Sequence, residues 1–266
     1  MIAPMQSGAY LTRIGHEGPA PATVQTLHAL TRAHTQAIPF ENIDVLLGRP
    51  VRLESAAVFD KLVHQRRGGY CFEQNGLFLR VLQELGFSAT GLGARVRLCT
   101  PDRSEIPART HLLVCVELQG ERWLTDVGFG ALSLTQALRW EHGLVQDTPH
   151  DRRRLVHEDG RWFHQVWQEG GWVDVYEFTG EPMPESDRKV ANWYTSTHPE
   201  STFMGQLMVA RALPDGGRLT MVGNELRRRH PDGHMDARPV APEQLHGVLL
   251  EHFGIRWPGE AAPSQD

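Results

Sequence analysis

The sequence predicts an α+β fold in which a helical region is followed by a strand-rich region and then by a mixed one. Up to about residue 86, apolar side chains recur every three or four positions, as they do in amphipathic helices. From about residue 87, short apolar runs separated by tight-turn signals favour an antiparallel barrel or sandwich. After about residue 190 both patterns occur, so we expect a division into residues 1–86, 87–190 and 191–266.

Three helices are expected in the first region. Residues 22–36 are one candidate, and residues 53–65 carry apolar side chains at helical spacing. In residues 72–86 the apolar positions again repeat by three and four, and Gly86 is a natural helix end.

Two tight turns organise the strands of the second region. Gln119-Gly120 separates two apolar runs, and Asp159-Gly160 is a strong signal for a two-residue hairpin turn. We therefore expect strands within residues 110–118, 121–129, 153–158, 161–168 and 172–178.

The third region follows a polar, proline-containing stretch at residues 180–189. Residues 203–213 and 217–226 are expected to be strands. Residues 241–254 carry apolar side chains on one side of a C-terminal helix. The tail at residues 257–266 is expected to fray.

Composition and charge exclude several classes of protein. The 266 residues carry a net charge of −5 and a pI near 6.3, without the basic excess of a nucleic-acid-binding domain. The short basic runs at residues 152–154 and 227–229 have acidic neighbours and are typical of a solvated surface. No window holds 18 consecutive apolar residues, so we expect neither a membrane-spanning helix nor a membrane partner.

Cysteine usage and the first residues indicate a cytoplasmic protein. Three cysteines, at positions 71, 99 and 115, do not make a disulfide framework. The N-terminal residues lack the basic and apolar segments of a secretory signal. A reducing cytosol is therefore the expected compartment.

The segment RGGYCFEQN, residues 67–75, places Cys71 just after a Gly-Gly pair and at the start of a predicted helix. Gly68 and Gly69 permit a sharp backbone path and the close approach of another group. The positive end of a helix dipole favours the thiolate form that a nucleophilic cysteine needs. The alternative is a buried, inert cysteine, and the local sequence leaves both interpretations open.

His111 and Asp126 belong to the two strands of one predicted hairpin. If residues 119 and 120 form the turn, residue 113 faces Asp126, and His111 shares the face of residue 113. Asp126 then projects diagonally from His111, within reach of side chains, whereas a three-residue turn would place it on the opposite face. Taken alone, His111 could be a hydrogen-bonded barrel histidine and Asp126 a turn residue at a strand end.

The sequence does not support a metal or dinucleotide site. HExxH and CxxC are absent, and His230 and His234 have ligand-like spacing but lie in a loop with a proline and a glycine between them. GLG at residues 91–93 and GFG at 128–130 lack the third glycine and the helix of a dinucleotide-binding loop.

Five sequence blocks resemble the arylamine N-acetyltransferases of bacterial type. They follow one another in the order of that family, and RGGYCFEQN together with THLL and TDVGFG is highly specific. After residue 203 little motif remains. The blocks are AIPFENID (37–44), RRGGYCFEQN (66–75), RTHLLVCV (109–116), WLTDVGFG (123–130) and NWYTSTHPESTF (192–203).

The resemblance implies a papain-like triad of Cys71, His111 and Asp126, acetyl-coenzyme A as the donor and no metal. Cys71 would carry the acetyl group as a thioester and pass it to an arylamine, arylhydrazine or N-hydroxyarylamine, with ping-pong kinetics. His111 would move the proton, and Asp126 would fix the imidazole. The backbone N–H of Cys71 is the expected oxyanion donor. A role in xenobiotic metabolism accompanies this activity.

The resemblance also implies a helical bundle that carries the nucleophile, a β-barrel that carries His111 and Asp126, and a C-terminal α/β lid. Phe40, Tyr70, Phe129 and Phe203 fall at positions that line the amine pocket of the family, although core packing is the alternative for each phenylalanine.

Three further residues are assigned to the surroundings of Cys71. Gly130 is expected to let the coenzyme A chain approach the backbone. Glu41 and Arg67 are expected to form a buried ion pair that holds the catalytic loop.

Two other interpretations stay open at this point. A related cysteine-triad enzyme with another acyl donor, such as an amide synthase or a hydrolase, would carry the same reactive residues. A non-catalytic binding module would keep the fold, although the intact cysteine, histidine and aspartate weigh against it. The sequence carries no prediction of the oligomeric state.

Overall fold

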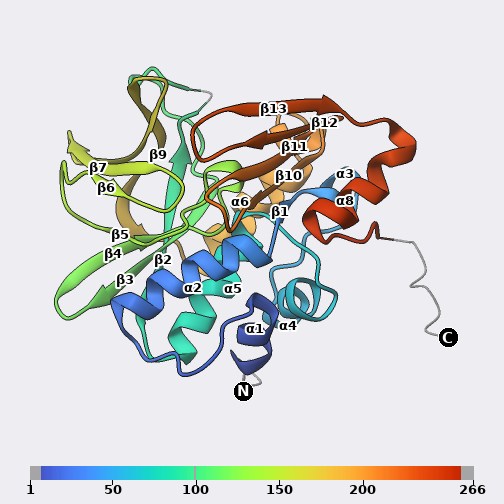
Figure 1. Ribbon diagram of the computed structural model, residues 1–266. Coiled ribbons are helices and arrows are strands. Elements are labelled where there is room, and N and C mark those ends of the chain that lie inside the picture. Colours follow the sequence, from blue (N-terminus) through green and yellow to red (C-terminus); the bar gives the residue numbers. More distant parts are fainter. Residues whose placement is uncertain (1–6, 99, 259–266) are drawn as a thin grey trace.

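The computed structural model describes residues 7–98 and 100–258 (Figure 1). It has the predicted α+β architecture, with N-terminal helices, a large curved sheet and a second, smaller sheet beside the last helix. All but the first two residues of the tail expected to fray, 257–266, lie outside the described residues.

The structure confirms the three helices that were predicted in the N-terminal region, with one local difference. The helix expected at residues 53–65 continues from α4 into a π-helical turn at Asp60–His64. Gly86, with a φ of 86°, follows the end of α5 as predicted. These helices are α1 (Ser7–Ile14), α2 (Val24–Ala37), α3 (Ile43–Leu46), α4 (Ser55–Phe59) and α5 (Cys71–Glu84).

Apolar spacing did not predict α1, because one of the buried residues of α1 is an arginine. Arg13 donates hydrogen bonds to the carbonyl oxygens of Leu62 and Ala37, at 3.0 and 2.8 Å. Its guanidinium thus pairs backbone carbonyl oxygens that would otherwise lack a donor, so the buried face of α1 includes a charged side chain and is not an apolar repeat.

The larger sheet is a nearly closed barrel of eight antiparallel strands, in the order β5-β4-β3-β2-β9-β8-β7-β6. Its edge strands are linked by the Gln146 side chain, which accepts from the N–H of Arg139 at 2.8 Å and donates to its carbonyl oxygen at 3.1 Å. The strands are β2 (Ser88–Val96), β3 (His111–Leu118), β4 (Glu121–Thr125), β5 (Leu138–Arg139), β6 (Gln146–Asp147), β7 (Arg152–Glu158), β8 (Arg161–Gln168) and β9 (Gly171–Pro182).

The two predicted hairpin turns are confirmed. Gln119 and Gly120 have φ angles of 53° and 80°, and Asp159 and Gly160 have φ angles of 48° and 75°. Left-handed backbone at both central residues is the mark of a type I′ turn, whose twist matches that of the flanking strands. The first turn therefore pairs Leu118 with Glu121 and sets the register that brings His111 and Asp126 to one face.

The smaller sheet has the order β1-β10-β11-β12-β13 and packs its apolar face against α8. Its first strand comes from the N-terminal region, since Phe40 pairs with Ala210 and Glu41 with Val209. Its elements are β1 (Phe40–Glu41), β10 (Met208–Ala212), β11 (Arg218–Val222), β12 (Glu225–Arg229) and β13 (Met235–Pro239), followed by α8 (Leu245–Phe253) within the predicted helix 241–254.

Three predictions in the last third of the chain are wrong in detail. Residues 203–213 begin as the short helix α7 (Thr202–Gly205), because Ser201 caps it with its side chain, and only then enter β10. Residues 217–226 form parts of two strands, because Gly223, with a φ of 59°, turns the chain between β11 and β12. In addition, no helix was predicted at α6 (Glu185–Thr197), which begins after Pro184, inside the polar, proline-containing stretch at residues 180–189.

The expected three-part division of the chain stays a prediction. The boundary expected after residue 190 lies within α6, and β1 joins the helical region to the sheet of the last region. Among residues 7–98 and 100–258, no helix is both long and apolar enough to span a lipid bilayer.

Candidate active site

Cys71 is the first residue of α5 and is 4 % exposed. The two glycines before it are needed for close packing. A Cβ atom on Gly68 would lie 2.1 Å from the carbonyl oxygen of Pro39, and one on Gly69 would lie 2.6 Å from a carboxylate oxygen of Glu73. The Gly-Gly pair thus lets the catalytic loop lie directly against its neighbours, as the sequence indicated.

Glu73 fixes the start of the helix that carries Cys71. Its carboxylate accepts the backbone N–H of Tyr70 at 3.0 Å, and Glu73 itself is buried. This contact pairs a backbone donor that the helix start would otherwise leave free. The role of Glu73, which the sequence left open, is therefore to cap α5.

A network of buried charges surrounds this cap. Lys61, from the π-helical turn, lies 2.7 Å from the carboxylates of both Glu73 and Asp44. Arg67 contacts Glu41 at 2.6 Å and Asp44 at 3.2 Å, so the predicted Glu41–Arg67 ion pair is confirmed. Three acidic and two basic side chains thus alternate beneath the loop that precedes Cys71.

The charges of this network control one another's protonation. Burial alone lowers the pKa of Lys61, but the negative charges of Glu73, Glu41 and Asp44 outweigh burial and raise that pKa. Burial raises the pKa of Glu73, and Lys61 opposes the rise. Each charge therefore depends on its partner, because neither ion could stay buried and unpaired without a large cost.

The structure brings His111 and Asp126 into direct contact. Nε2 of His111 lies 2.7 Å from Oδ2 of Asp126, and both side chains are buried. His111 opens β3, while Asp126 follows the end of β4. The contact agrees with the register predicted from the two-residue turn.

Asn75 and Gly128 hold the other side of the Asp126 carboxylate. Oδ1 of Asp126 accepts from Nδ2 of Asn75 at 2.8 Å and from the N–H of Gly128 at 3.1 Å. Asn75 also donates to the carbonyl oxygen of Leu112 and accepts the N–H of Val127. This side chain, whose role the sequence left open, therefore ties α5 to the strand ends that carry His111 and Asp126.

His111 is poised as a charged group. Burial lowers the pKa of His111, but the charge of Asp126 and hydrogen bonds to Asp126 and Cys71 raise it to about 10. Nε2 of His111 faces Asp126, which leaves Nδ1 as the ring nitrogen available to another partner. Cys71 lines the same cavity as His111, and its sulfur lies 3.7 Å from the carbonyl oxygen of Thr110, the residue before His111.

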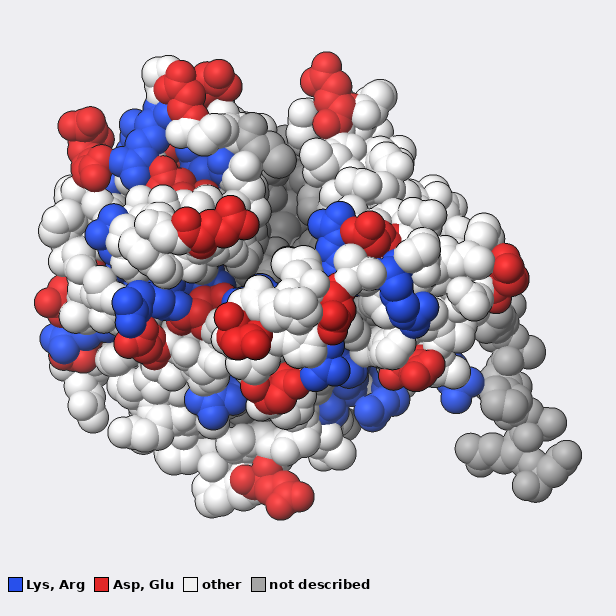
Figure 2. Space-filling model, turned by 45° about the horizontal axis from the view of Figure 1, so that its top comes forward, with Lys and Arg blue, Asp and Glu red and all other residues white. Residues whose placement is uncertain are grey.

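A cavity of about 380 Å³ opens onto Cys71 and His111. Figure 2 shows the surface hollowed between its two lobes, with acidic and basic side chains intermingled around them. Phe40, Phe129 and Phe203 line the cavity, as does Gly130. Residues from α5, from the barrel and from the smaller sheet all contribute, so the cavity exists only in the assembled fold.

Tyr70 takes a different place from the one expected. It is fully buried and does not line this cavity. Its ring lies behind Phe203, with centroids 5.6 Å apart, and its hydroxyl donates to Asn192. The hydroxyl thereby joins the catalytic loop to α6, an element that the sequence analysis missed.

Two glycines follow Asp126, and both need to be glycine. Gly130 has a φ of 77°, and an added Cβ would lie 3.4 Å from the Phe40 ring. At Gly128 an added Cβ would lie 2.8 Å from the Cα of Cys71. The sequence did not predict this close packing at Gly128, although the position of Gly128 two residues after a candidate catalytic aspartate could have indicated it.

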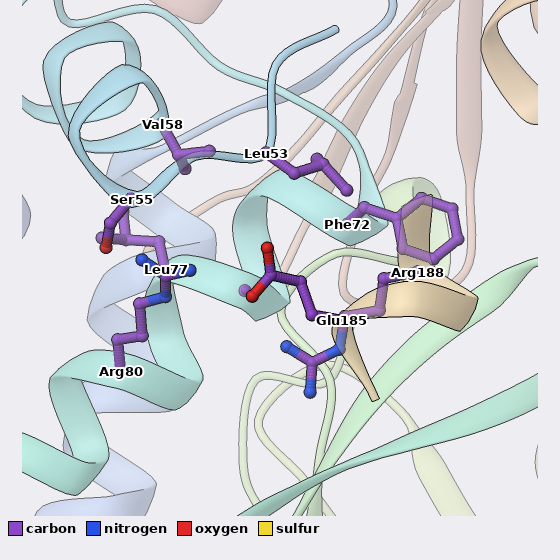
Figure 3. A pocket seen from close by; sticks show the side chains of 9 residues that line it. Leu53, Ser55, Val58, Phe72, Leu77, Arg80, Glu185 and Arg188 are labelled. Carbon is purple, nitrogen blue, oxygen red and sulfur yellow. The ribbon is translucent and has the colours of Figure 1, made fainter. Parts of the chain in front are cut away.

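Two further candidates in the described part of the chain are weaker. A cavity of about 20 Å³ beside α5, lined by Phe72, Arg80 and Glu185 among others, is too small for a substrate (Figure 3). His230 and His234 both contact Asp236, at 2.7 and 3.2 Å. Within residues 7–98 and 100–258, no group of three or more metal-ligating side chains could hold a metal ion.

Comparison with known proteins places this arrangement in a family. The profile of a family described as N-acetyltransferase matches residues 23–261. An arylamine N-acetyltransferase of Escherichia coli is 42 % identical over 92 % of this chain and 87 % of that protein. The chain belongs to the arylamine N-acetyltransferase family.

Solved structures of arylamine N-acetyltransferases share the fold. The enzyme from Salmonella typhimurium superposes with a TM-score of 0.90 at 39 % identity, over 94 % of this chain and 90 % of that one. The enzyme from Mycobacterium marinum in complex with CoA has a TM-score of 0.89 at 37 % identity, over 94 % and 93 %. As a member of this family, the protein is an acetyltransferase.

Proposed function

We propose that the protein moves an acetyl group from acetyl-CoA, through a thioester on Cys71, to aromatic amines by a ping-pong mechanism. The observation that carries the proposal is that Cys71 and His111 line one cavity while the His111 imidazole contacts Asp126. The acceptors are arylamines, arylhydrazines or N-hydroxyarylamines. The CoA bound to the Mycobacterium marinum relative supports this donor.

In the first half-reaction the Cys71 thiolate attacks the thioester carbonyl of acetyl-CoA. The carbon–sulfur bond to CoA breaks, and the departing CoA sulfur takes the proton held by His111. Acetyl-Cys71 and a neutral imidazole remain. The burial of Cys71 limits the access of water, which would otherwise hydrolyse the intermediate.

In the second half-reaction the amine nitrogen attacks the acetyl carbon. The amine proton passes to the neutral His111, and the Cys71 sulfur leaves as the thiolate. Asp126 supports the positive charge that returns to His111 and fixes the ring, because its carboxylate is itself held by Asn75 and Gly128. The N–H of Cys71, at the start of α5, is the proposed donor to the oxyanion.

The aromatic acceptor is proposed to bind against Phe40, Phe129 and Phe203. Flat apolar side chains suit an aromatic ring, and these three line the cavity beside Cys71. Tyr70 supports Phe203 from behind instead of contacting the acceptor. Gly130, which also lines the cavity, is proposed to leave room for the coenzyme A chain.

Assignments of the three regions of the chain, and two cellular assignments, accompany this proposal. The helical region supplies the nucleophile, the barrel supplies His111 and Asp126, and the last region covers the cavity. A cytoplasmic location and a role in xenobiotic metabolism remain part of the proposed function, consistent with the cysteine usage of the sequence.

Incubation with acetyl-CoA alone tests the proposal. We expect the intact protein to gain the mass of one acetyl group, with release of one equivalent of CoA, and the Cys71→Ala variant to gain none. Cys115→Ala is the matched control, since Cys115 is a buried thiol that does not line the cavity at Cys71 and should leave the gain intact. A protein that gains no acetyl group and releases no CoA would not use this mechanism.

A further inference from the structure

A buried aspartate contacts three arginines at the junction of the barrel and the smaller sheet. The side chain of Asp151, the residue before β7, is 3 % exposed and lies 2.7 Å from Arg153 of β7 and 2.7 Å from Arg229 of β12. It also contacts Arg218 of β11. Within the part of the chain that the structure describes, these arginines form no other ion pair. Asp151 is therefore their shared counter-charge.

The charges at this junction are unbalanced, with one carboxylate for three guanidinium groups. Arg153 and Arg218 are both buried. Burial alone would raise the pKa of Asp151, but the charges of Arg153 and Arg218 outweigh burial and hold that pKa well below its usual range. Arg218 and Arg229 are also cross-strand partners, a placement in which like charges repel each other. Without the charge of Asp151, the arginines would repel one another across the junction.

Two of these arginines hold the end of a segment that lines the active-site cavity. The segment comprises residues 128–131. The carbonyl oxygen of Leu132 accepts from Arg153 at 3.2 Å, and the carbonyl oxygen of Ser133 accepts from Arg218 at 3.0 Å. The guanidinium groups that contact Asp151 thus also fix the chain directly after the lining segment.

Arg218 belongs as well to a strand that supplies another part of the lining. It is the first residue of β11, and Thr220 and Val222 of the same strand line the cavity. Because side chains alternate along a strand, these three project from one face of the smaller sheet. A shift of Arg218 relative to Ser133 would therefore move one part of the cavity lining against another.

We propose that Asp151 is a positioning residue for acetyl transfer. Its charge keeps residues 128–131 and β11 in the relative placement that the substrates need. Asp151 does not line the cavity, so it acts through Arg153 and Arg218 and not on the reacting atoms. The inference rests on the proposed function and adds a residue outside the cavity to it.

Removal of the Asp151 side chain, followed by its replacement with a free anion, tests the proposal in the full chain. We expect Asp151→Ala to lower kcat/KM for acetyl transfer to an uncharged arylamine by about tenfold to a hundredfold, since small displacements of reacting groups are costly. The variant leaves a space among three guanidinium groups that formate, a small carboxylate, can enter. Added formate should restore most of the lost kcat/KM, because it returns the missing negative charge.

The reactivity of Cys71 separates a positioning role from a general loss of structure. Iodoacetamide is small and reacts with Cys71 without the help of a bound substrate. We expect its rate with Cys71 to be the same in Asp151→Ala and in the unmodified protein, because Asp126 is held independently by Asn75. If kcat/KM and the alkylation rate fell together, Asp151 would have only a structural role and the proposal would be wrong.

Asp147 provides the matched control. It lies shortly before Asp151 in the chain and pairs with Arg152 at 2.9 Å, and its side chain is 73 % exposed. Asp147→Ala should keep its kcat/KM, and formate should not change it. The unmodified protein in the same formate solution corrects for any general effect of the salt. An equal loss in both variants, or a loss in Asp151→Ala that formate does not restore, would overturn the proposal.

A second variant decides the question if Asp151→Ala does not fold. Arg218→Met removes the link from β11 to Ser133, while two arginines still pair with Asp151. Apolar replacement of a buried charge is often neutral for stability, so we expect this variant to fold. Its kcat/KM should fall while the alkylation of Cys71 stays unchanged. An unchanged kcat/KM in Arg218→Met would contradict the proposal.

The proposed function and this inference fail differently. If acetyl-CoA does not acetylate Cys71 of the unmodified protein, the proposed function fails. If the unmodified protein transfers the acetyl group and Asp151→Ala does so with the same kcat/KM, the proposed function stands and only the role of Asp151 is wrong.

Discussion

Nε2 of His111 lies 2.7 Å from Oδ2 of Asp126, although the two residues are 15 positions apart. The distance follows from a two-residue turn at the other end of the hairpin, which sets the pairing of β3 with β4. This contact occupies one ring nitrogen of His111 and leaves the other for Cys71.

Replacement of Asp126 by asparagine should remove the charge that stabilises the His111 imidazolium. We expect kcat/KM for acetyl transfer to fall by about a hundredfold or more, because general acid–base catalysis is worth that much and the ring loses its orienting anion. Steady-state kinetics with acetyl-CoA and a neutral arylamine measures the loss. Asp159→Asn, at an exposed hairpin turn, is the matched control and should leave kcat/KM unchanged.

The stability of the protein should fall as the pH rises above neutrality. The pKa of His111 is raised to about 10, so its charged form is favoured in the folded state relative to the unfolded chain. That contribution is fully present below the unfolded pKa of about 6.5 and is lost as the pH rises through 10. Urea unfolding at pH 7 and pH 10 should show this loss, and His111→Gln should show a smaller one. An equal loss in both proteins would assign the effect to other groups.

Cys71 should react faster with iodoacetamide than free cysteine does at pH 6. The imidazolium of His111 and the start of α5 both place positive charge near the Cys71 sulfur, and such surroundings are typical of reactive cysteines. Cys115 is an internal control, because burial raises the pKa of its thiol to about 11 and it should stay unmodified. Peptide mass spectrometry identifies the labelled residue. A Cys71 that is no more reactive than free cysteine would argue against an ion pair with His111.

Lys61 should be a large contributor to the stability of the catalytic loop. Lys61→Met leaves the buried Glu73 and the half-buried Asp44 without their shared cation, and we expect a loss of about 3–5 kcal/mol in the free energy of unfolding. The double variant Lys61→Met with Glu73→Gln should lose less stability than Lys61→Met alone, because Glu73→Gln removes one of the two carboxylates that Lys61→Met leaves without their lysine. Urea unfolding measures both.

A surface ion pair provides the control for Lys61. Lys189 and Glu185 are 2.9 Å apart on α6, and their side chains are 64 % and 68 % exposed. Lys189→Met should cost less than about 1 kcal/mol, because exposed pairs contribute little. If Lys61→Met cost no more than Lys189→Met, the buried network would not stabilise the loop.

Gly128→Ala should displace the nucleophile. The added methyl group would lie 2.8 Å from the Cα of Cys71, so α5 or the segment after Asp126 would have to shift. We expect kcat/KM to fall by about tenfold to a hundredfold, since small displacements of reacting groups are costly. The control is Gly76→Ala. Gly76 lies within α5 and has no atom within 4 Å of an added Cβ, so this variant should keep its activity. Matched activity in the two variants would show that the close approach tolerates a methyl group.

Much of the candidate site follows from local rules that sequence expresses directly. The turn at Gln119-Gly120 is encoded by residues that accept left-handed backbone, and side chains alternate across a strand, so the shared face of His111 and Asp126 could be predicted. The start of a helix at Cys71 likewise follows from local apolar spacing and the preceding glycines.

Local rules failed where an element is defined by distant partners. The buried face of α1 is built on Arg13, whose hydrogen bonds reach Leu62 and Ala37. Tyr70 lies behind Phe203 and bonds to Asn192, more than a hundred residues along the chain. The periodicity of the sequence indicates which side chains are apolar, but it does not indicate which distant residues pack against them.

By itself, the sequence determined the α+β class, the two hairpin turns and the shared face of His111 and Asp126. Only the tertiary structure decided that α5 packs against β3, so that Cys71 meets His111, and that Lys61, Asp44 and Glu73 converge under the loop. The physical reason is the distance along the chain between the residues that interact. Turn type and strand register depend on neighbouring residues, whereas the cavity beside Cys71 depends on segments that meet only when the whole core is packed.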